Sequence, residues 1–317
     1  MSVAAPVPAA EGREAITRVL TTLETIILGK PQQIRLCLAC LLARGHLLIE
    51  DVPGVGKTTL AHALAHVLGL AWQRVQFTAD LLPADIIGVS VFDRASQQFH
   101  FRRGPIFTQL LLADEVNRAS PRTQSALLEA MEERQVSADG TTYVLPEPFF
   151  VVATQNPHEQ LGTFGLPESQ LDRFLMRVIL GYPDAVHERE LLRSGERREL
   201  LATIAPVLSA AQVLGVQRAV RAVHVAEPLL DYAQALITRT RERSDLKLGL
   251  SPRAGQGLIR AAQAWGFLDG RAAVLPEDVQ AVLPSVVAHR LERRDPAGVT
   301  EGATVAAEII RAVAVPL

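Results

Sequence analysis

The sequence predicts an α/β core built on a parallel β-sheet and followed by an α-helical domain. Strand and helix patterns alternate through the first 180 residues, and five apolar strand candidates lie among them. After residues 181–184 the chain becomes rich in Ala, Leu and Arg with helical spacing. Alternating strands and helices form parallel sheets covered on both faces, which bind ligands beyond the carboxyl ends of their strands.

The predicted strands are short apolar runs, and they span His46–Glu50, Arg74–Phe77, Leu110–Asp114, Phe149–Thr154 and Phe174–Leu180. Two helical segments between them have clear boundaries. The first, Lys57–Leu68, is closed by Gly69, and the second, Pro121–Arg134, begins with Ser120 as its N-cap. A serine N-cap followed by proline is a strong helix start.

Two short segments interrupt the alternation and predict β-hairpins. Val89–Asp93 and Gln98–Arg102 alternate apolar and polar residues around a loop. Gln135–Ser137 and Thr142–Leu145 flank an Asp-Gly pair, which supplies the positive φ angles of a tight turn. We interpret hairpins that project from a rigid core as contact devices.

The composition indicates a soluble globular protein, since 48% of the residues are apolar and 21% are charged. The net charge of −2 argues against nucleic acid as a partner, because sequence-independent nucleic-acid binders carry a basic domain.

We expect residues 1–13 to be a disordered tail, residues 14–181 the core with its two hairpins, and residues 182–317 the helical domain. The Ala- and Pro-rich start has neither a basic segment nor a continuous apolar stretch, so it is not a secretory signal. The apolar run Cys37–Ala43 is far shorter than the ~18 residues of a membrane span. The predicted location is cytoplasmic, without a membrane segment.

Two residue pairs have metal-like spacing but are interpreted as structural. Cys37 and Cys40 lie in a helical pattern, where both thiols occupy one inward face, and no second Cys/His pair completes a zinc site. His62 and His66 lack the glutamate of the H-E-x-x-H pattern. We expect buried core thiols and partly packed helical histidines.

The segment from residue 51 to residue 58 resembles the phosphate-binding P-loop, G-x-x-x-x-G-K-[ST], with Asp51 in place of the first glycine. Its backbone N–H groups and the following helix N-terminus create an anion site. Lys57 is expected to reach the β- and γ-phosphates, and the Thr58 hydroxyl to coordinate Mg²⁺. The predicted nucleotide-binding residues are Asp51, Val52, Pro53, Gly54, Val55, Gly56, Lys57, Thr58 and Thr59. A Rossmann pattern is excluded because Thr59 stands where it needs glycine.

An acidic pair ends the apolar strand that follows, at Asp114 and Glu115. This arrangement is typical of a Walker B element. Asp114 is expected to hold Mg²⁺ through water, and Glu115 to orient and polarise the attacking water. The alternative is a helix cap. Together with the P-loop, the pair predicts hydrolysis of the nucleotide.

Three further polar residues are candidates for the site. Asn156 ends a buried strand beside the P-loop, although Asn-Pro is also an ordinary turn. Arg173 is suited to complete another subunit's site, with a salt bridge to Asp172 or Glu168 as the alternative. Arg253 lies in the first turn of a helix, where a cation is unfavourable unless an anion lies opposite. An ordinary surface arginine is the alternative there.

The order of these elements resembles that in the AAA+ ATPases, and the sequence blocks resemble those of their MoxR family. The blocks that carry the resemblance are GHLLIEDVPGVGKTTLA, FTADLLPADIIG, ADEVNRASPRTQSALLEAMEE, VATQNP, LPESQLDRF and SPRAG. They run from about residue 30 to residue 295, and Asp51 agrees with many family members.

The resemblance implies an αβα sandwich with a five-stranded parallel sheet, followed by an α-helical lid. It implies a hexameric ring with ATP and Mg²⁺ at the subunit interfaces. Asn156 becomes the sensor-1 residue, Arg173 the arginine finger and Arg253 the sensor-2 residue, which reports γ-phosphate to the lid. Family members remodel, mature or activate partner proteins, often with a von Willebrand factor A domain protein.

Three other functions fit parts of the pattern. A nucleotide-dependent scaffold would bind ATP without useful turnover, which the acidic pair and Arg173 argue against. A small-molecule P-loop kinase carries its arginines in a short lid rather than in a whole helical domain. A DNA motor or clamp-loader relative is disfavoured by the near-neutral charge.

Overall fold

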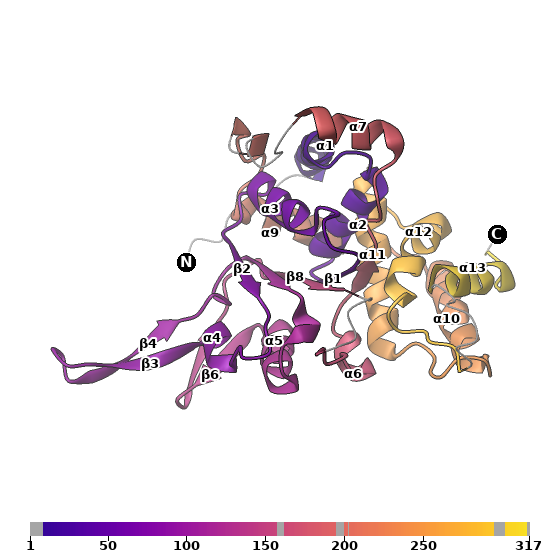
Figure 1. Ribbon diagram of the computed structural model, residues 1–317. Coiled ribbons are helices and arrows are strands. Elements are labelled where there is room, and N and C mark those ends of the chain that lie inside the picture. The colour runs from indigo at the N-terminus through magenta and orange to yellow at the C-terminus, as the bar shows by residue number, and fades with distance from the viewer. Residues whose placement is uncertain (1–8, 157–161, 195–199, 202, 295–301, 316–317) are drawn as a thin grey trace.

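The centre of the computed structural model is a parallel five-stranded sheet with the order β2-β5-β8-β1-β9 (Figure 1). The structure describes residues 9–156, 162–194, 200–201, 203–294 and 302–315. The strands are β1 (Leu47–Glu50), β2 (Trp72–Gln76), β5 (Leu110–Asp114), β8 (Phe150–Gln155) and β9 (Met176–Val178). The predicted α/β fold with its parallel sheet is confirmed.

The last strand is shorter at both ends than the predicted Phe174–Leu180. The Phe174 carbonyl accepts hydrogen bonds from His289 and Arg290 of the helical region, so it does not continue the ladder. At the other end, the Leu180 amide donates to the Asp51 carboxylate at 2.7 Å. Both ends of β9 are therefore held by side chains from other parts of the chain.

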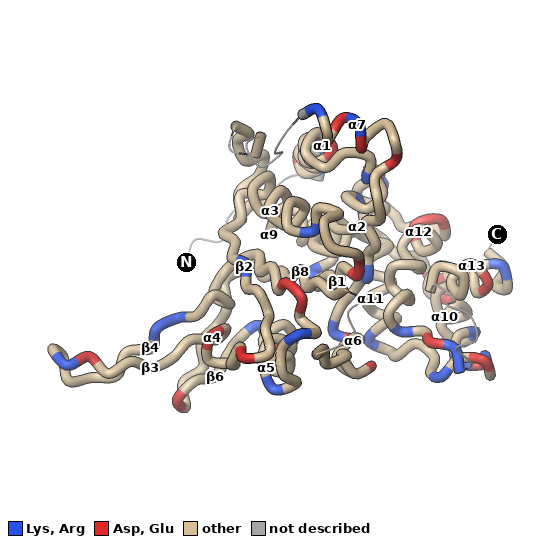
Figure 2. The backbone as a smooth tube through the Cα atoms, in the orientation of Figure 1, with Lys and Arg blue, Asp and Glu red and all other residues tan. Residues whose placement is uncertain are grey.

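The two faces of the sheet belong to separate apolar clusters, because successive strand side chains point to opposite sides. Leu47 and Leu112 contribute to one cluster, and Leu48 and Leu111 to the other. The first face is covered by α1 (Ala9–Ile26), α2 (Pro31–Leu42) and α3 (Lys57–Val67). The second is covered by α4 (Pro83–Ile87), the 3-10 turn η1 (Val116–Arg118) and α5 (Pro121–Glu133). Along α3 the tube is almost entirely uncharged (Figure 2).

Both predicted hairpins are present and project together from the core (Figure 1). They are β3 (Gly88–Asp93) with β4 (Gln98–Arg103), and β6 (Gln135–Ala138) with β7 (Thr141–Val144). The Phe101 and Tyr143 rings stack with centroids 4.3 Å apart, and Ser90 hydrogen-bonds to Asp139. These contacts join the hairpins into one projecting unit.

The described residues after β9 are mainly helical and pack directly on the core. After α6 (Glu168–Leu171), the helices are α7 (Ala185–Ser194), α9 (Ala210–Arg221), α10 (Glu227–Glu242), α11 (Pro252–Leu268), α12 (Pro276–Val287) and α13 (Gly302–Ala312). Residues of α9 to α13 share one apolar cluster with α1 to α3. The boundary near residue 182 remains a prediction.

At the amino end, α1 begins at Ala9, inside the stretch predicted as a tail, because its apolar face packs into the core at Ile16 and Val19. Residues 1–8 lie outside the described residues. Among the described helices, none combines the length and apolar character that crossing a bilayer requires.

Candidate active site

The P-loop connects β1 to α3 at the carboxyl edge of the sheet. Gly54 and Gly56 have φ angles of 85° and 94°, in the left-handed region that favours glycine. A Cβ added to either would meet no heavy atom within 4 Å. The glycines therefore leave open space above the loop, and α3 begins directly behind it at Lys57. An open loop at a helix N-terminus is suited to bind phosphate.

Asp51 has a contact pattern that the sequence does not suggest. Its buried carboxylate accepts hydrogen bonds from the backbone amides of Val52 at 2.8 Å, Leu180 at 2.7 Å and Gly181 at 2.6 Å. These bonds tie the first residue of the loop to the chain that leaves β9. Asp51 was predicted to bind nucleotide, but its carboxylate faces the protein backbone.

Lys57 and Thr58 lie at the start of α3, as predicted. The Lys57 ammonium donates to the Asp51 carbonyl at 2.6 Å, so it lies across the loop. Both residues are half-buried.

Asp114 ends β5 with its carboxylate almost fully buried. One oxygen accepts from the Thr154 hydroxyl at 2.6 Å. The other accepts from Arg74 Nε at 3.1 Å and Nη2 at 2.7 Å. The sequence analysis did not predict Arg74 as a site residue. The one signal for it is that a charged residue stands beside the buried Val75 on β2.

Glu115 follows in the left-handed region with φ 57°, which is unfavourable for a residue with a side chain. Its amide donates to Thr154 Oγ1 at 2.9 Å. Its carboxylate accepts from Gln76 Nε2 at 2.7 Å and pairs with Arg118 at 3.1 Å. The carboxylate is thus held in place from two sides.

Asn156 is buried directly after β8, the strand between β5 and β1. The sheet order therefore places it between the acidic pair and the P-loop, as the sequence predicts.

These residues fit a nucleotide with Mg²⁺. The loop offers open space, glycine backbone and a helix N-terminus to phosphate. Oxygen ligands suit Mg²⁺, and Thr58 with Asp114 supplies a hydroxyl and a carboxylate at the same edge of the sheet.

Arg173 lies at the opposite edge of the sheet. The register pairs Leu47 with Met176, so Arg173 precedes the amino end of β9, whereas Asp51 follows the carboxyl end of β1. The four residues from Met176 to Leu180, whose amide donates to the Asp51 carboxylate, by themselves span roughly 13 Å at ~3.3 Å per residue. An arginine side chain does not span this distance to its own P-loop.

Arg253 lies beside Arg173, since both pair with Glu132 of α5. The Arg253 Nη1 atom is 2.6 Å from Glu132 Oε1, and Arg173 contacts the other oxygen. Arg253 thus lies with Arg173, and its role as the sensor-2 residue stays a prediction. The predicted alternative for Arg173, an ion pair with Asp172 or Glu168, is not the pairing observed, because Arg173 pairs with Glu132.

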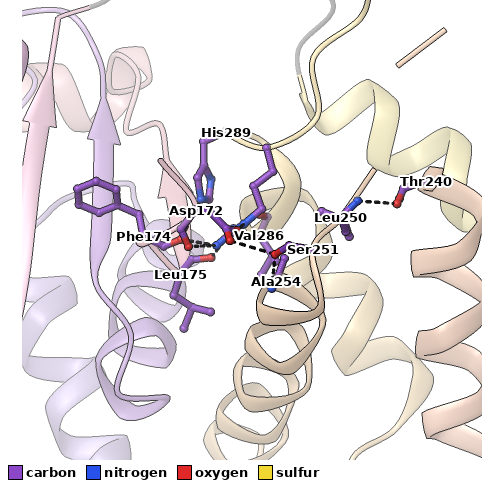
Figure 3. A network of polar contacts seen from close by, with 10 residues as sticks. Asp172, Phe174, Leu175, Thr240, Leu250, Ser251, Ala254, Val286 and His289 are labelled. Carbon is purple, nitrogen blue, oxygen red and sulfur yellow. Dashed lines mark hydrogen bonds and ion pairs between the residues drawn. The ribbon is translucent and has the colours of Figure 1, made fainter. Parts of the chain in front are cut away.

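Asp172 instead joins the core to the helical domain (Figure 3). It accepts from the Ser251 hydroxyl at 3.0 Å and from Arg290 Nε at 2.7 Å. Ser251 is the N-cap of α11 and also accepts from the Ala254 amide. The residue before Arg173 is therefore bonded to the helix that carries Arg253.

The paired cysteines and histidines are structural. Cys37 and Cys40 are fully buried in α2 as free thiols. His62 stacks on Trp72 with ring centroids 4.3 Å apart, and His66 bonds to the Ile204 carbonyl.

The fold and the P-loop with its acidic strand end define a P-loop ATPase of the AAA+ class. Two family models match: the ATPase family associated with various cellular activities over residues 46–176, and the AAA lid domain over residues 238–313. A crystal structure of a candidate ATPase from Cytophaga hutchinsonii superposes with a TM-score of 0.89 at 35% identity. That match covers 98% of this chain and 97% of the other.

The similar curated proteins identify the family within this class. Chaperone MoxR1 of Mycobacterium tuberculosis is 40% identical over 90% of this chain and 79% of its own length. The uncharacterized protein YeaC of Bacillus subtilis is 44% identical over 92% of both chains. The chain belongs to the MoxR family of AAA+ ATPases.

Proposed function

We propose that this ATPase hydrolyses ATP with Mg²⁺ in a hexameric ring of identical subunits, and that each site is completed by the neighbouring subunit. The observation that carries this proposal is the separation of the P-loop from Arg173 and Arg253, which lie at opposite edges of one sheet. Residues on opposite edges of one subunit meet when subunits associate head to tail, and such contacts close into rings.

Within one subunit, the loop amides and Lys57 bind the phosphates. Thr58 and Asp114 would hold Mg²⁺, which supplies charge neutralisation when bound. Glu115 orients the attacking water and accepts its proton. Asn156, between the acidic pair and the loop, positions the same water and the γ-phosphate.

From the neighbour, Arg173 and Arg253 stabilise the charge that develops on the transferred phosphoryl group. In the isolated chain Glu132 holds both guanidinium groups, so binding at the neighbour's phosphate exchanges one anionic partner for another. Asp172 carries the resulting movement to α11 and α12 through Ser251 and Arg290. The bonds of Asp51 carry it from the loop to residues 180 and 181.

The movement serves to remodel, mature or activate partner proteins in the cytoplasm, as in a chaperone, with a von Willebrand factor A domain protein as one kind of partner. The name of the relative Chaperone MoxR1 supports this role. The β3–β4 hairpin supports it as well, because it projects from the core and leaves Phe99 71% exposed and Phe92 48% exposed.

Mixing two inactive variants tests the shared site. Lys57→Ala disables the P-loop, and Arg173→Ala disables the opposite edge. In a mixed ring, the P-loop of an Arg173→Ala subunit meets the intact arginine of a Lys57→Ala subunit. We expect phosphate release from the mixture and little from either variant alone. A mixture as inactive as its components, in a verified mixed ring, would contradict the proposal.

A further inference from the structure

Four arginines surround a pocket of about 210 Å³ that lies between the core and the helical domain, next to the segment that leads into the amino end of β1. Arg44 and Arg134 come from the core, at the ends of α2 and α5. Arg221 ends α9, and Arg260 lies in the middle of α11. Positively charged side chains from both the core and the helical domain thus line the pocket.

The positive charge of this pocket is not balanced within the described residues. Arg44 pairs with Glu147 at 3.0 Å, and Arg134 donates to the neutral carbonyl of Arg44. The side chains of Arg221 and Arg260 have no ion pair or hydrogen bond in the described part of the chain. Burial lowers the pKa of Arg134, and the charge of Arg44 lowers it further. Burial and the nearby Arg253 and Arg221 lower the pKa of Arg260.

Helix termini account for some of these positions but not for their convergence. Arg44, Arg134 and Arg221 each lie at a helix C-terminus, where the partial negative charge favours a cation. Arg260 lies two turns into α11 from Arg253 and has no such compensation. Four guanidinium groups around one pocket repel each other, and the helix ends do not remove that repulsion.

The pocket also contains a buried polar atom without a partner. Gln217 of α9 is 6% exposed and donates from Nε2 to the Leu41 carbonyl at 2.8 Å. Its Oε1 atom has no hydrogen-bond partner among the described residues. A buried acceptor left unpaired destabilises the folded protein, because it has lost its hydrogen bonds to water. A ligand or its bound water would satisfy this oxygen.

We propose that this pocket binds a small multivalent phosphate anion of diphosphate size, which clamps the core to the helical domain. Guanidinium forks match phosphate oxygens, and a diphosphate brings enough charge to balance three unpaired arginines. The volume of the pocket exceeds the space that one water molecule needs, and it suits an anion of diphosphate size. The diphosphate is either free pyrophosphate or part of a nucleotide. This site is separate from the P-loop and does not depend on hydrolysis.

Pyrophosphate binding to the full chain in a Lys57→Ala background tests the proposal, because that change weakens phosphate binding at the P-loop. We expect titration calorimetry to show pyrophosphate binding, and Arg260→Gln or Arg134→Gln to weaken it about tenfold or more. Arg94→Gln, in the exposed turn between β3 and β4, is the matched control and should leave the affinity unchanged. An equal affinity for ADP would identify a nucleotide as the source, and no affinity for ADP would identify free pyrophosphate.

Thermal unfolding supplies a second readout. Without an anion, Arg260→Gln should raise the melting temperature because it removes repulsion, and pyrophosphate should no longer raise it further. Three results would overturn the proposal: no pyrophosphate binding to Lys57→Ala, the same affinity after Arg260→Gln, or the same thermal effect from sodium chloride at matched ionic strength. A change in oligomeric state with unchanged affinity would assign the arginines to a subunit contact instead.

Discussion

Arg74 holds one oxygen of Asp114 through two hydrogen bonds, at 3.1 Å from Nε and 2.7 Å from Nη2. A cation on this carboxylate opposes the binding of a second cation there. We expect Arg74→Gln to lower the Mg²⁺ concentration for half-maximal ATPase activity by roughly threefold or more. A magnesium titration at saturating ATP measures it. An unchanged or higher magnesium requirement would show that Arg74 does not compete with the metal.

Glu115 is held by Gln76 and Arg118, so its carboxylate is positioned without nucleotide. We expect Glu115→Gln to bind ATP normally and to hydrolyse it roughly 10²–10⁴ times more slowly, since the base is lost but the shape is kept. Single-turnover phosphate release and nucleotide-binding titrations separate the two effects. Normal turnover in this variant would remove Glu115 from the mechanism.

The buried carboxylate of Asp51 ties the P-loop to residues 180 and 181 through two hydrogen bonds. Asp51→Asn keeps the size of the side chain but weakens acceptance from these amides. We expect a loss of about 1–3 kcal/mol in the free energy of unfolding, together with weaker ATP binding. Denaturant unfolding and nucleotide titration measure them. Glu24→Gln on the exposed face of α1 is the control, and equal behaviour of the two variants would refute a role for this tie.

Two buried histidines predict loss of stability in mild acid. His46 donates from Nε2 to the Met131 carbonyl and accepts from the Val151 amide at Nδ1, and burial lowers its pKa to about 3. Burial also lowers the pKa of His289 well below its ordinary value, beside the cations Arg290 and Arg177. Because both folded-state pKa values lie below that of the unfolded chain, their contribution is complete above pH ~6.5 and is lost as the pH falls.

Each histidine should lower the free energy of unfolding by about 1.4 kcal/mol per pH unit below ~6.5. Denaturant unfolding between pH 7 and pH 5 tests this slope. His289→Asn should reduce the slope, whereas His100→Gln on the exposed hairpin should leave it unchanged. A stability that does not vary over this range would contradict the buried neutral state of both rings.

Cys37 and Cys40 should not react with thiol reagents in the folded protein. Burial raises the pKa of Cys37 to about 12 and that of Cys40 well above its ordinary value, so the reactive thiolate is scarce as well as inaccessible. We expect both thiols to be modified only at the rate of unfolding. Rapid modification in native buffer would show that α2 opens locally.

Elements whose chemistry is local can be predicted from residue order. The P-loop is a continuous segment, since its glycines, Lys57 and Thr58 act through one turn and one helix end. Asp114 and Glu115 follow an apolar strand, and strand alternation alone predicts that such strand ends meet at one edge of the sheet. The hairpins and the change to helices after residue 184 are likewise visible in residue order.

Contacts between distant segments depend on the three-dimensional packing of the elements. Arg74 and Asp114 are 40 residues apart, and Glu132, Arg173 and Arg253 come from three different elements. The periodicity of the sequence does not predict which charged side chains form ion pairs. Their pairing depends on strand register and on how α11 packs against the core. The same reason explains why Arg253 lies beside Arg173, and why the Asp51 carboxylate accepts hydrogen bonds from distant backbone amides.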